Sequence, residues 1–112
     1  MKDMLDRLAK ADPATYKGYK YLCDCIVWQS WERGEDRPII EERILQGELQ
    51  EAIQAHRSAD FLNDWFWKIE YLDCDIYEAT VYRRTGYISK ERHDSPAAAL
   101  LTAYLSAIEE QA

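Results

Sequence analysis

The fold is decided by residues 65–92, which read WFWKIEYLDCDIYEATVYRRTGYISKER. Two sets of residues alternate at the start of this stretch, one beginning with Trp65 and the other with Phe66. A period of two places such sets on opposite faces of a β-strand. The sequence therefore predicts a strand over residues 65–72 that carries large rings on both of its faces.

Two turn signals divide the rest of the stretch. The acidic triplet around Cys74 is ordinary turn chemistry, and the Thr-Gly pair at 85–86 marks a second turn. Residues 76–84 are rich in Ile, Tyr, Thr and Val, so we expect a second strand there and a short third strand over 87–92. Connections this short join antiparallel neighbours, which predicts a three-stranded meander.

Helical patterns flank the predicted sheet on both sides. We expect helices over residues 2–10, from 13 to about 33, over 37–56, and from Ser95 onward, because a capping side chain followed by Pro precedes each of the last three. The apolar stripes expected to be buried are Tyr16, Tyr19, Cys23, Ile26, Val27 and Trp31 in the second helix, Ile40, Ile44, Leu45, Leu49, Ala52, Ile53 and His56 in the third, and Ala97, Leu100, Leu101, Tyr104, Leu105 and Ile108 in the last.

The order of the elements is that of an α+β domain, with N-terminal helices, a meander sheet and a C-terminal helix packed on the sheet. The 112 residues are the size of one domain, and no internal repeat or linker divides them. Hydrophobic residues make up 47% and charged residues 31% of the chain, which is typical of a globular protein. We therefore expect a single domain over residues 1–112.

The N-terminus and the cysteines bear on the compartment. The first residues contain no apolar stretch of the kind found in a signal peptide, and no apolar run approaches the roughly 20 residues of a membrane-spanning helix. The three cysteines are an odd number without a disulfide framework. We expect a cytoplasmic protein that contacts no membrane.

The net charge of −7 narrows the range of partners. A protein that grips a phosphate backbone needs a basic face, so we expect no direct contact with nucleic acid. Acidic charge instead suits a protein partner with a basic surface, and it also keeps a small protein in solution. The acid gathers in the helix expected over 37–56, where the candidate partner-binding residues are Glu41, Glu42, Glu48 and Glu51.

Aromatic residues are more numerous than a minimal core requires, with four Trp and eight Tyr. Tyr21 and Trp28 lie partly off the apolar face of the second helix, and Trp31 follows Trp28 by three positions. Exposed rings often mark contact sites, because they bury a large area at a low entropic cost. We interpret Trp28 and Trp31 as candidate partner-binding residues. The alternatives are core packing and the symmetric interface of a homo-oligomer, such as a homodimer.

Cysteine and histidine leave open a further alternative, a small enzyme. Cys23 and Cys25 point about 200° apart on a helix and cannot easily share a metal ion. Catalysis would require Cys74 to meet His56 or His93 across the fold, and no local pattern predicts that pair. The chain has no glycine-rich phosphate loop, zinc-binding HExxH sequence or nucleophile elbow. We expect no catalytic residues, no metal ligands and no cofactor.

Basic residues gather in the second half of the predicted sheet. One interpretation is a local contact with an anion or a nucleic acid. The other, which is the commoner arrangement, is a solvated edge whose charges discourage aggregation between strands. The residues concerned are Arg83, Arg84, Lys90 and Arg92.

The C-terminal half resembles small phage- and prophage-encoded proteins with an α/β/α sandwich. The resemblance covers residues 65–108 and rests on the strand segment YEATVY at 77–82, the turn at 85–86 and the helix start SPAAALL at 95–101. It implies an accessory protein with no catalytic residues to carry over. Together with the small size and the acidic charge, it leads us to expect a non-enzymatic protein-binding protein. The sharpest form of this expectation is an inhibitor of a host defence complex, similar to an anti-CRISPR.

Overall fold

The computed structural model describes residues 2–33, 37–56 and 63–111, with the backbone alone at 29–33, 37–40 and 111. The N-terminal half forms the helices α1 (Lys2–Ala11), α2 (Pro13–Arg33) and α3 (Arg37–Gln54). The C-terminal half forms the strands β1 (Phe66–Leu72), β2 (Ile76–Arg83) and β3 (Gly86–His93), followed by the helix α4 (Pro96–Gln111).

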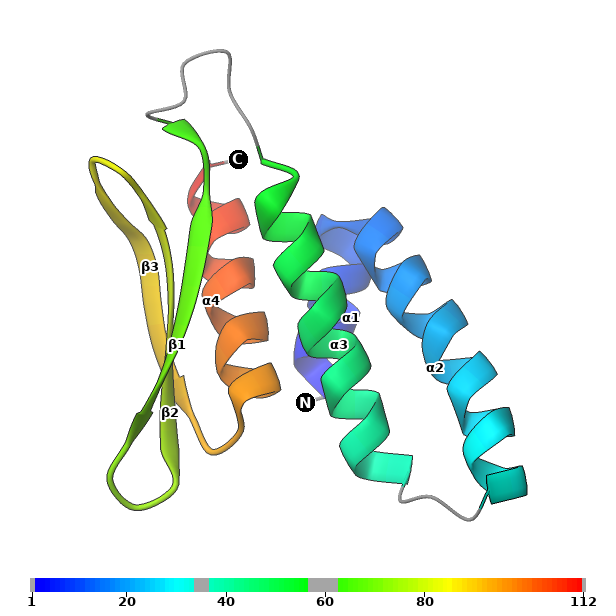
Figure 1. Ribbon diagram of the computed structural model, residues 1–112. Helices are drawn as coiled ribbons and strands as arrows, with labels where there is room; N and C mark the ends of the chain where they lie inside the picture. Colours follow the sequence, from blue (N-terminus) through cyan, green and yellow to red (C-terminus); the bar gives the residue numbers. More distant parts are fainter. Residues whose placement is uncertain (1, 34–36, 57–62, 112) are drawn as a thin grey trace.

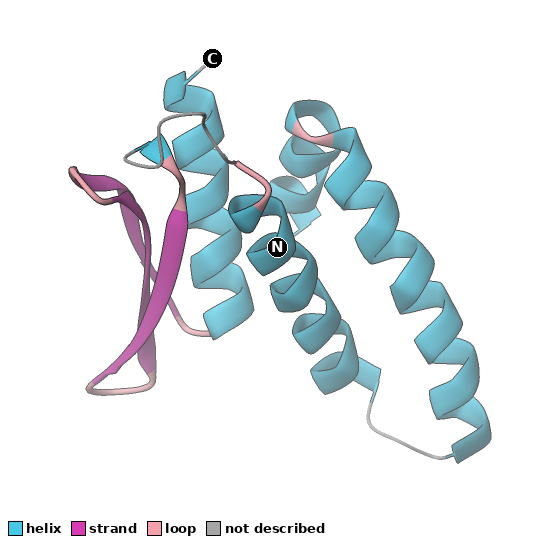
Figure 2. Ribbon diagram, turned by 45° about the horizontal axis from the view of Figure 1, so that its top comes forward, coloured by secondary structure: helices cyan, strands magenta, loops and turns pink. Residues whose placement is uncertain are grey.

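The elements stack in layers, which Figure 1 and Figure 2 show from two directions. The sheet is one outer layer, with the order β1-β2-β3 and antiparallel pairing. Helix α4 packs on one face of the sheet, against β2 and β3, and α3 packs against α4. Helix α2 lies on the far side and packs on α3 and α1. The predicted α+β fold, with its meander and a C-terminal helix on the sheet, is confirmed.

Side-chain caps begin two helices where the sequence predicts. The Asp12 carboxylate accepts hydrogen bonds from the Thr15 backbone N–H, at 3.4 Å, and from the Thr15 hydroxyl, at 2.6 Å, just before α2. The Ser95 hydroxyl accepts a hydrogen bond from the Ala98 N–H at 3.1 Å and caps α4. Helix α3 ends at Gln54, two residues earlier than predicted. None of the described helices combines the length and the apolar composition that crossing a bilayer requires.

Both hairpin turns use backbone conformations with positive φ. In the turn between β1 and β2, Cys74 (φ 62°) and Asp75 (φ 57°) occupy the left-handed region. In the second turn, Gly86 has a φ of 151°, which the absence of a Cβ makes accessible. The two turn signals read from the sequence therefore lie at real turns.

A β-bulge interrupts the pairing of β2 with β3. Val81 pairs with Ser89 and Tyr82 pairs with Tyr87, so Ile88 is the extra residue of β3. Ile88 packs against the core, and the adjacent Ser89 hydroxyl donates a 2.5 Å hydrogen bond to an α4 carbonyl. Two consecutive residues of β3 thus serve the helix side of the sheet.

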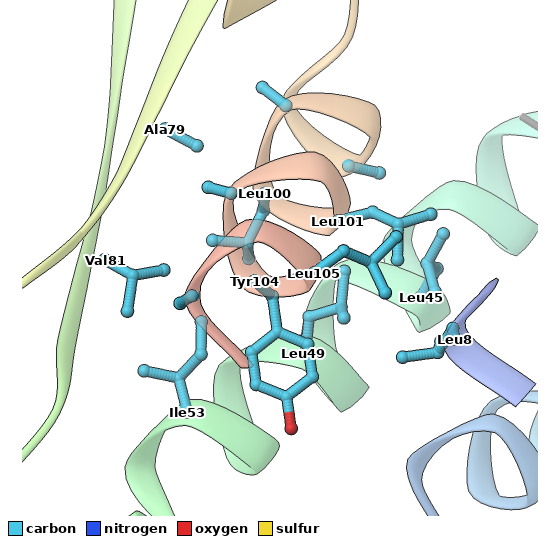
Figure 3. Close-up of a cluster of buried hydrophobic side chains, with 14 of the residues drawn as sticks. Leu8, Leu45, Leu49, Ile53, Ala79, Val81, Leu100, Leu101, Tyr104 and Leu105 are labelled. Atoms are coloured by element: carbon cyan, nitrogen blue, oxygen red, sulfur yellow. The ribbon is translucent and has the colours of Figure 1, made fainter. Parts of the chain in front are cut away.

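The core lies between the sheet and α4, and between α4 and α3 (Figure 3). The predicted stripes of α3 and α4 supply most of it, and full burial of one such leucine or isoleucine contributes about 1.5–3 kcal/mol. The expectation that His56 would be buried with the α3 stripe is wrong, because His56 lies beyond the end of α3 and is exposed. Among its described side chains, the predicted stripe of α2 is only partly buried, with Cys23 as the buried member. The largest fully buried side chains are Leu8, Leu45, Leu49, Ile53, Val81, Leu100, Leu101, Tyr104 and Leu105.

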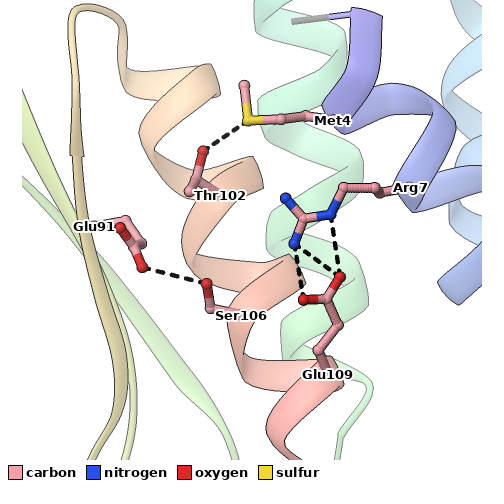
Figure 4. Close-up of polar contacts among 6 residues, drawn as sticks. All are labelled: Met4, Arg7, Glu91, Thr102, Ser106 and Glu109. Carbon is pink, nitrogen blue, oxygen red and sulfur yellow. Dashed lines mark hydrogen bonds and ion pairs between the residues drawn. The ribbon is translucent and has the colours of Figure 1, made fainter.

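Polar contacts fasten α4 to its neighbours on both sides (Figure 4). Arg7 of α1 forms an ion pair with Glu109, in which Nη2 lies 2.8 Å from each carboxylate oxygen. On the sheet side, the Ser106 hydroxyl donates a 3.2 Å hydrogen bond to Glu91 of β3. Because the Arg7 pair is half exposed, it contributes at most about 1 kcal/mol and mainly orients α1.

Candidate interaction surfaces

The predicted acidic residues of α3 do not share one open surface. Glu42 and Glu51 are exposed, whereas Glu48 is half-buried and turns toward α2. A Cβ added at Gly18 would lie 2.6 Å from Glu48 Oε2, so the absence of a side chain at Gly18 makes room for this carboxylate. Burial raises the pKa of Glu48, and the neighbouring Glu51 carboxylate raises it further.

Glu41 also faces α2. A hydrogen bond joins it to the thiol of Cys23; burial raises the pKa of that thiol, and the Glu41 carboxylate raises it further. Tyr19 is hydrogen-bonded to the same thiol. Glu41 and Glu48 therefore join α2 to α3, and Glu42 and Glu51 are the members of the predicted set that are open to a partner.

The outward face of α2 carries an apolar stripe. Tyr21, Cys25 and Trp28 recur at the i, i+4, i+7 spacing of one helix face, and the exposed fraction is 70% for Tyr21 and 67% for Trp28. With Asp24 they line a shallow depression of about 500 Å³. The structure thus places the predicted Trp28 on an open surface. Trp31 belongs to α2, but its side chain lies outside the described residues.

The second open surface is the outer face of the sheet, on the side away from α4. The strand register arranges its side chains in three rows across the strands. An aromatic row lies nearest the β2–β3 turn, a row with two lysines lies next to it, and a row of opposite charges follows. The rows are Phe66, Tyr82 and Tyr87; Lys68, Thr80 and Lys90; and Glu70, Glu78 and Arg92.

The bulge brings Tyr87 and Lys90 onto the same face. They are three positions apart, so an uninterrupted strand would point them to opposite faces. Instead, Lys90 Nζ lies 5.6 Å from the centre of the Tyr87 ring. Reading the sequence for alternation misses this neighbourhood, because the bulge is visible only in the pairing of the strands.

The buried carboxylate of Glu78 interacts with the two basic residues of β3 on this face, Lys90 and Arg92. It accepts a 2.9 Å hydrogen bond from Arg92 Nε and lies 3.9 Å from Lys90 Nζ. The Arg92 hydrogen bond, with the help of the Lys90 charge, holds the pKa of Glu78 below its usual value. At the other end, the Arg84 guanidinium lies 5.6 Å from the centre of the Phe66 ring. Since β3 is an edge strand of the described sheet, this placement fits both interpretations of the basic cluster.

A polar cluster joins α2, α3 and α4 near the start of β1. The His56 ring stacks on Trp65, with 4.0 Å between ring centres, and the Tyr104 hydroxyl donates a 2.5 Å hydrogen bond to Asp12. Burial by itself would raise the pKa of Asp12, but its hydrogen bonds with Thr15 and Tyr104 prevail and hold that pKa below the usual value. Burial lowers the pKa of His56, and the nearby Asp12 charge partly offsets this shift.

The structure separates one pair of the enzyme alternative, Cys74 and His56, and leaves Cys74 and His93 at the same end of the sheet. His56 lies beside Trp65 at one end of β1 and Cys74 lies in the turn at the other end, which is a separation of about 23 Å along the strand. His93 lies at the Cys74 end of the sheet, where its Nδ1 is 2.7 Å from an Asp94 oxygen. Within residues 2–28, 41–56 and 63–110, no three side chains of the metal-binding types lie close enough together to hold an ion.

Comparisons with protein-family models, with curated proteins and with solved structures found no match. The molecule has two open surfaces suited to binding, the outward face of α2 and the outer face of the sheet. In Figure 1 they lie on opposite sides of the molecule.

Proposed function

We propose that this is a protein-binding protein whose outward α2 face docks on another protein. The observation that carries the proposal is the exposure of two large rings, Tyr21 and Trp28, on a helix whose opposite face already packs on its neighbours. A ring left in water contributes little to folding, whereas its burial in a complex contributes about 1.5–3 kcal/mol. Trp and Tyr are enriched among the residues that dominate binding energies.

The charge that favours a basic partner lies mostly outside α2. Asp24 lines the depression beside the stripe, and Glu42 and Glu51 are exposed on the neighbouring helix. Lys17 and Lys20 are exposed basic residues of α2. The net charge of −7 extends the negative potential over the molecule, which speeds encounter with a positive surface. The partner we propose presents an apolar recess surrounded by Lys and Arg.

A host defence complex that handles nucleic acid fits this description, because surfaces that receive nucleic acid are basic. The resemblance of residues 65–108 to phage-encoded accessory proteins supports the same class of target. An anti-CRISPR-like inhibitor acting in the cytoplasm is therefore the specific form of the proposal.

The test begins with capture of partners from a bacterial lysate at low and high salt, followed by titration of the purified partner. Substituting Tyr21→Ala together with Trp28→Ala is expected to weaken affinity by at least about thirty-fold. Asp24→Lys is expected to weaken it and to flatten its salt dependence. Tyr71→Ala is the matched control, because it removes a similarly exposed ring from β1.

Two outcomes would contradict this function. Equal affinity of the wild type and the Tyr21/Trp28 variant would exclude the α2 face. A purified chain that sediments as a dimer, and becomes monomeric in that variant, would show that the face receives a second copy rather than a different protein.

A further inference from the structure

The central row of the outer sheet face has the arrangement of an anion site. Lys68 and Lys90 flank Thr80 on the two neighbouring strands, with their backbones about 10 Å apart. Both lysine side chains are about half exposed. Their long, flexible stems allow the two ammonium groups to converge above Thr80, so one anion can contact both.

The hydroxyl of Thr80 is a further hydrogen-bond donor in this row. It is 3% exposed, and among the described residues its Oγ1 has no hydrogen-bond partner. Buried hydroxyls in folded proteins are nearly always paired, because an unpaired one is costly. Thr80 lines a depression of about 550 Å³ together with Lys68, Lys90, Tyr82 and Tyr87. The hydroxyl oxygen is itself covered, so an oxygen of a ligand held in this depression can satisfy it once the neighbouring side chains shift aside.

The aromatic row forms the adjacent wall of the depression. Tyr87 is 71% exposed, and Tyr82 is half-buried against Phe66, with 5.6 Å between their ring centres. Rings presented in this way stack with any nucleobase, since every base has a π face. Neighbouring rows lie about 7 Å apart along the strands, a distance that a sugar can bridge between a base and a phosphate.

Two carboxylates share this face, and both are already engaged. Glu78 accepts the hydrogen bond of Arg92 at 2.9 Å and lies 3.9 Å from Lys90, while Glu70 pairs with Lys68 at 3.1 Å. The Lys68–Glu70 pair joins half-exposed groups and contributes little to stability. Glu78 is buried, but it keeps its closer hydrogen bond from Arg92 when Lys90 turns to another anion. The two lysines can therefore exchange a carboxylate for a phosphate at small cost.

We infer that the outer sheet face binds a nucleoside phosphate, whose base stacks on Tyr82 and Tyr87 and whose phosphate accepts hydrogen bonds from Lys68, Thr80 and Lys90. The depression of about 550 Å³ has the size of a small-molecule site. The net charge of −7 opposes a polyanionic strand, so the ligand is a free nucleotide rather than a nucleic acid. This site is distinct from the α2 face and does not depend on the proposed protein partner.

The test is a titration of AMP, adenosine and inorganic phosphate into isotope-labelled protein, followed by amide chemical shifts. AMP at about 1 mM is expected to shift amides of β2 and β3, whereas adenosine and inorganic phosphate bind at least about ten-fold more weakly, because each engages one row only. Absence of an AMP-dependent shift would overturn the inference. So would equal affinity for inorganic phosphate, or binding of a single-stranded oligoadenylate without binding of AMP.

The AMP affinity of site variants tests whether the ligand binds at the central row. Thr80→Val is expected to reduce AMP affinity about ten-fold while the Tm stays equal or rises, because the lost hydroxyl has no protein partner. Lys68→Ala combined with Lys90→Ala is expected to reduce affinity at least as much and to flatten its salt dependence. Lys10→Ala, an exposed lysine on α1, is the matched control. Wild-type affinity in both the Thr80 variant and the double lysine variant would overturn the assignment.

Discussion

Helices α4 and α2 are both rich in apolar residues, yet the fold uses them in opposite ways. Between Ala97 and Ala107 nearly every side chain of α4 is buried, whereas Cys23 is the buried residue among the described side chains of α2. The alanines of α4 let the sheet approach on one side and α3 on the other. The rings of Tyr21 and Trp28 are large and carry polar tips, and they stay in water. Apolar content alone therefore does not tell which helix forms the core.

The largest effect that separates the two helices is expected from Leu105→Ala. Leu105 is fully buried in α4, so the cavity should lower the free energy of unfolding by about 2–5 kcal/mol. The matched change on α2 is Leu22→Ala, at a side chain that is 40% exposed, and it should cost less than about 1 kcal/mol. Urea unfolding of both variants measures the difference. Equal losses would mean that α2 belongs to the core as fully as α4 does.

A smaller effect is expected at the hydrogen bond that joins Tyr104 of α4 to Asp12, the residue that caps α2. Tyr104→Phe should lower the free energy of unfolding by about 1 kcal/mol at neutral pH, because water still screens the half-buried carboxylate. The folded-state pKa of Asp12 is below 3.8, so its stabilisation is complete above pH 3.8 and is lost as the pH falls through that lower value. The gap between the variant and the wild type should therefore narrow in acid. Tyr77→Phe is the control, and an equal loss there would show that the Asp12 contact is not the cause.

His56, which stacks on Trp65 near Asp12 and Tyr104, should make the stability of the protein depend on pH in milder acid. Burial lowers its pKa below 6.5, so the unfolded chain takes up the proton first and stability falls as the pH drops below 6.5 toward the folded-state pKa. His56→Phe keeps a ring on Trp65 and should remove this fall, which we expect to be well below about 1 kcal/mol because water screens the exposed His56 ring. Thermal unfolding at a series of pH values measures the slope. The same slope in the variant and the wild type would assign it to other groups.

The smallest effect on folding is expected from Trp28→Ala. Because this ring is exposed, its loss should change the free energy of unfolding by no more than about 0.5 kcal/mol, even though it should weaken binding of the proposed partner. Denaturant unfolding and partner titration on the same preparation give both numbers. A loss of stability above about 1 kcal/mol would mean that Trp28 supports the fold and would weaken its role as a contact residue.

Local patterns in the sequence predicted most of the elements, because caps, turns and periodicity act over a few residues. The triplet around Cys74 and the cap at Ser95 are examples, and both lie where they were expected. Contacts between distant positions were not predictable in this way. Asp12 and Tyr104 meet across 92 positions, and only the folded chain shows that Glu48 turns toward α2.

The candidate sites also differ in whether local sequence or distant contacts define them. Trp28 could be singled out because its place off the helix stripe is a local property, and the structure shows it exposed. Thr80 reads in the sequence as an ordinary strand residue. Its importance arises only because Lys68 and Lys90 are its partners across β1 and β3, which depends on strand register.

The bulge at Ile88 gives the helix side of the sheet one side chain more than regular alternation would provide. A relative with one residue fewer between Gly86 and Ser89 would restore regular alternation there. The residue before Ser89 would still pair with Tyr82 and point away from α4, so the aromatic and lysine rows would keep a common face. The apolar contact that Ile88 makes with the core would be lost, so such a deletion would lower stability while leaving the outer face in place.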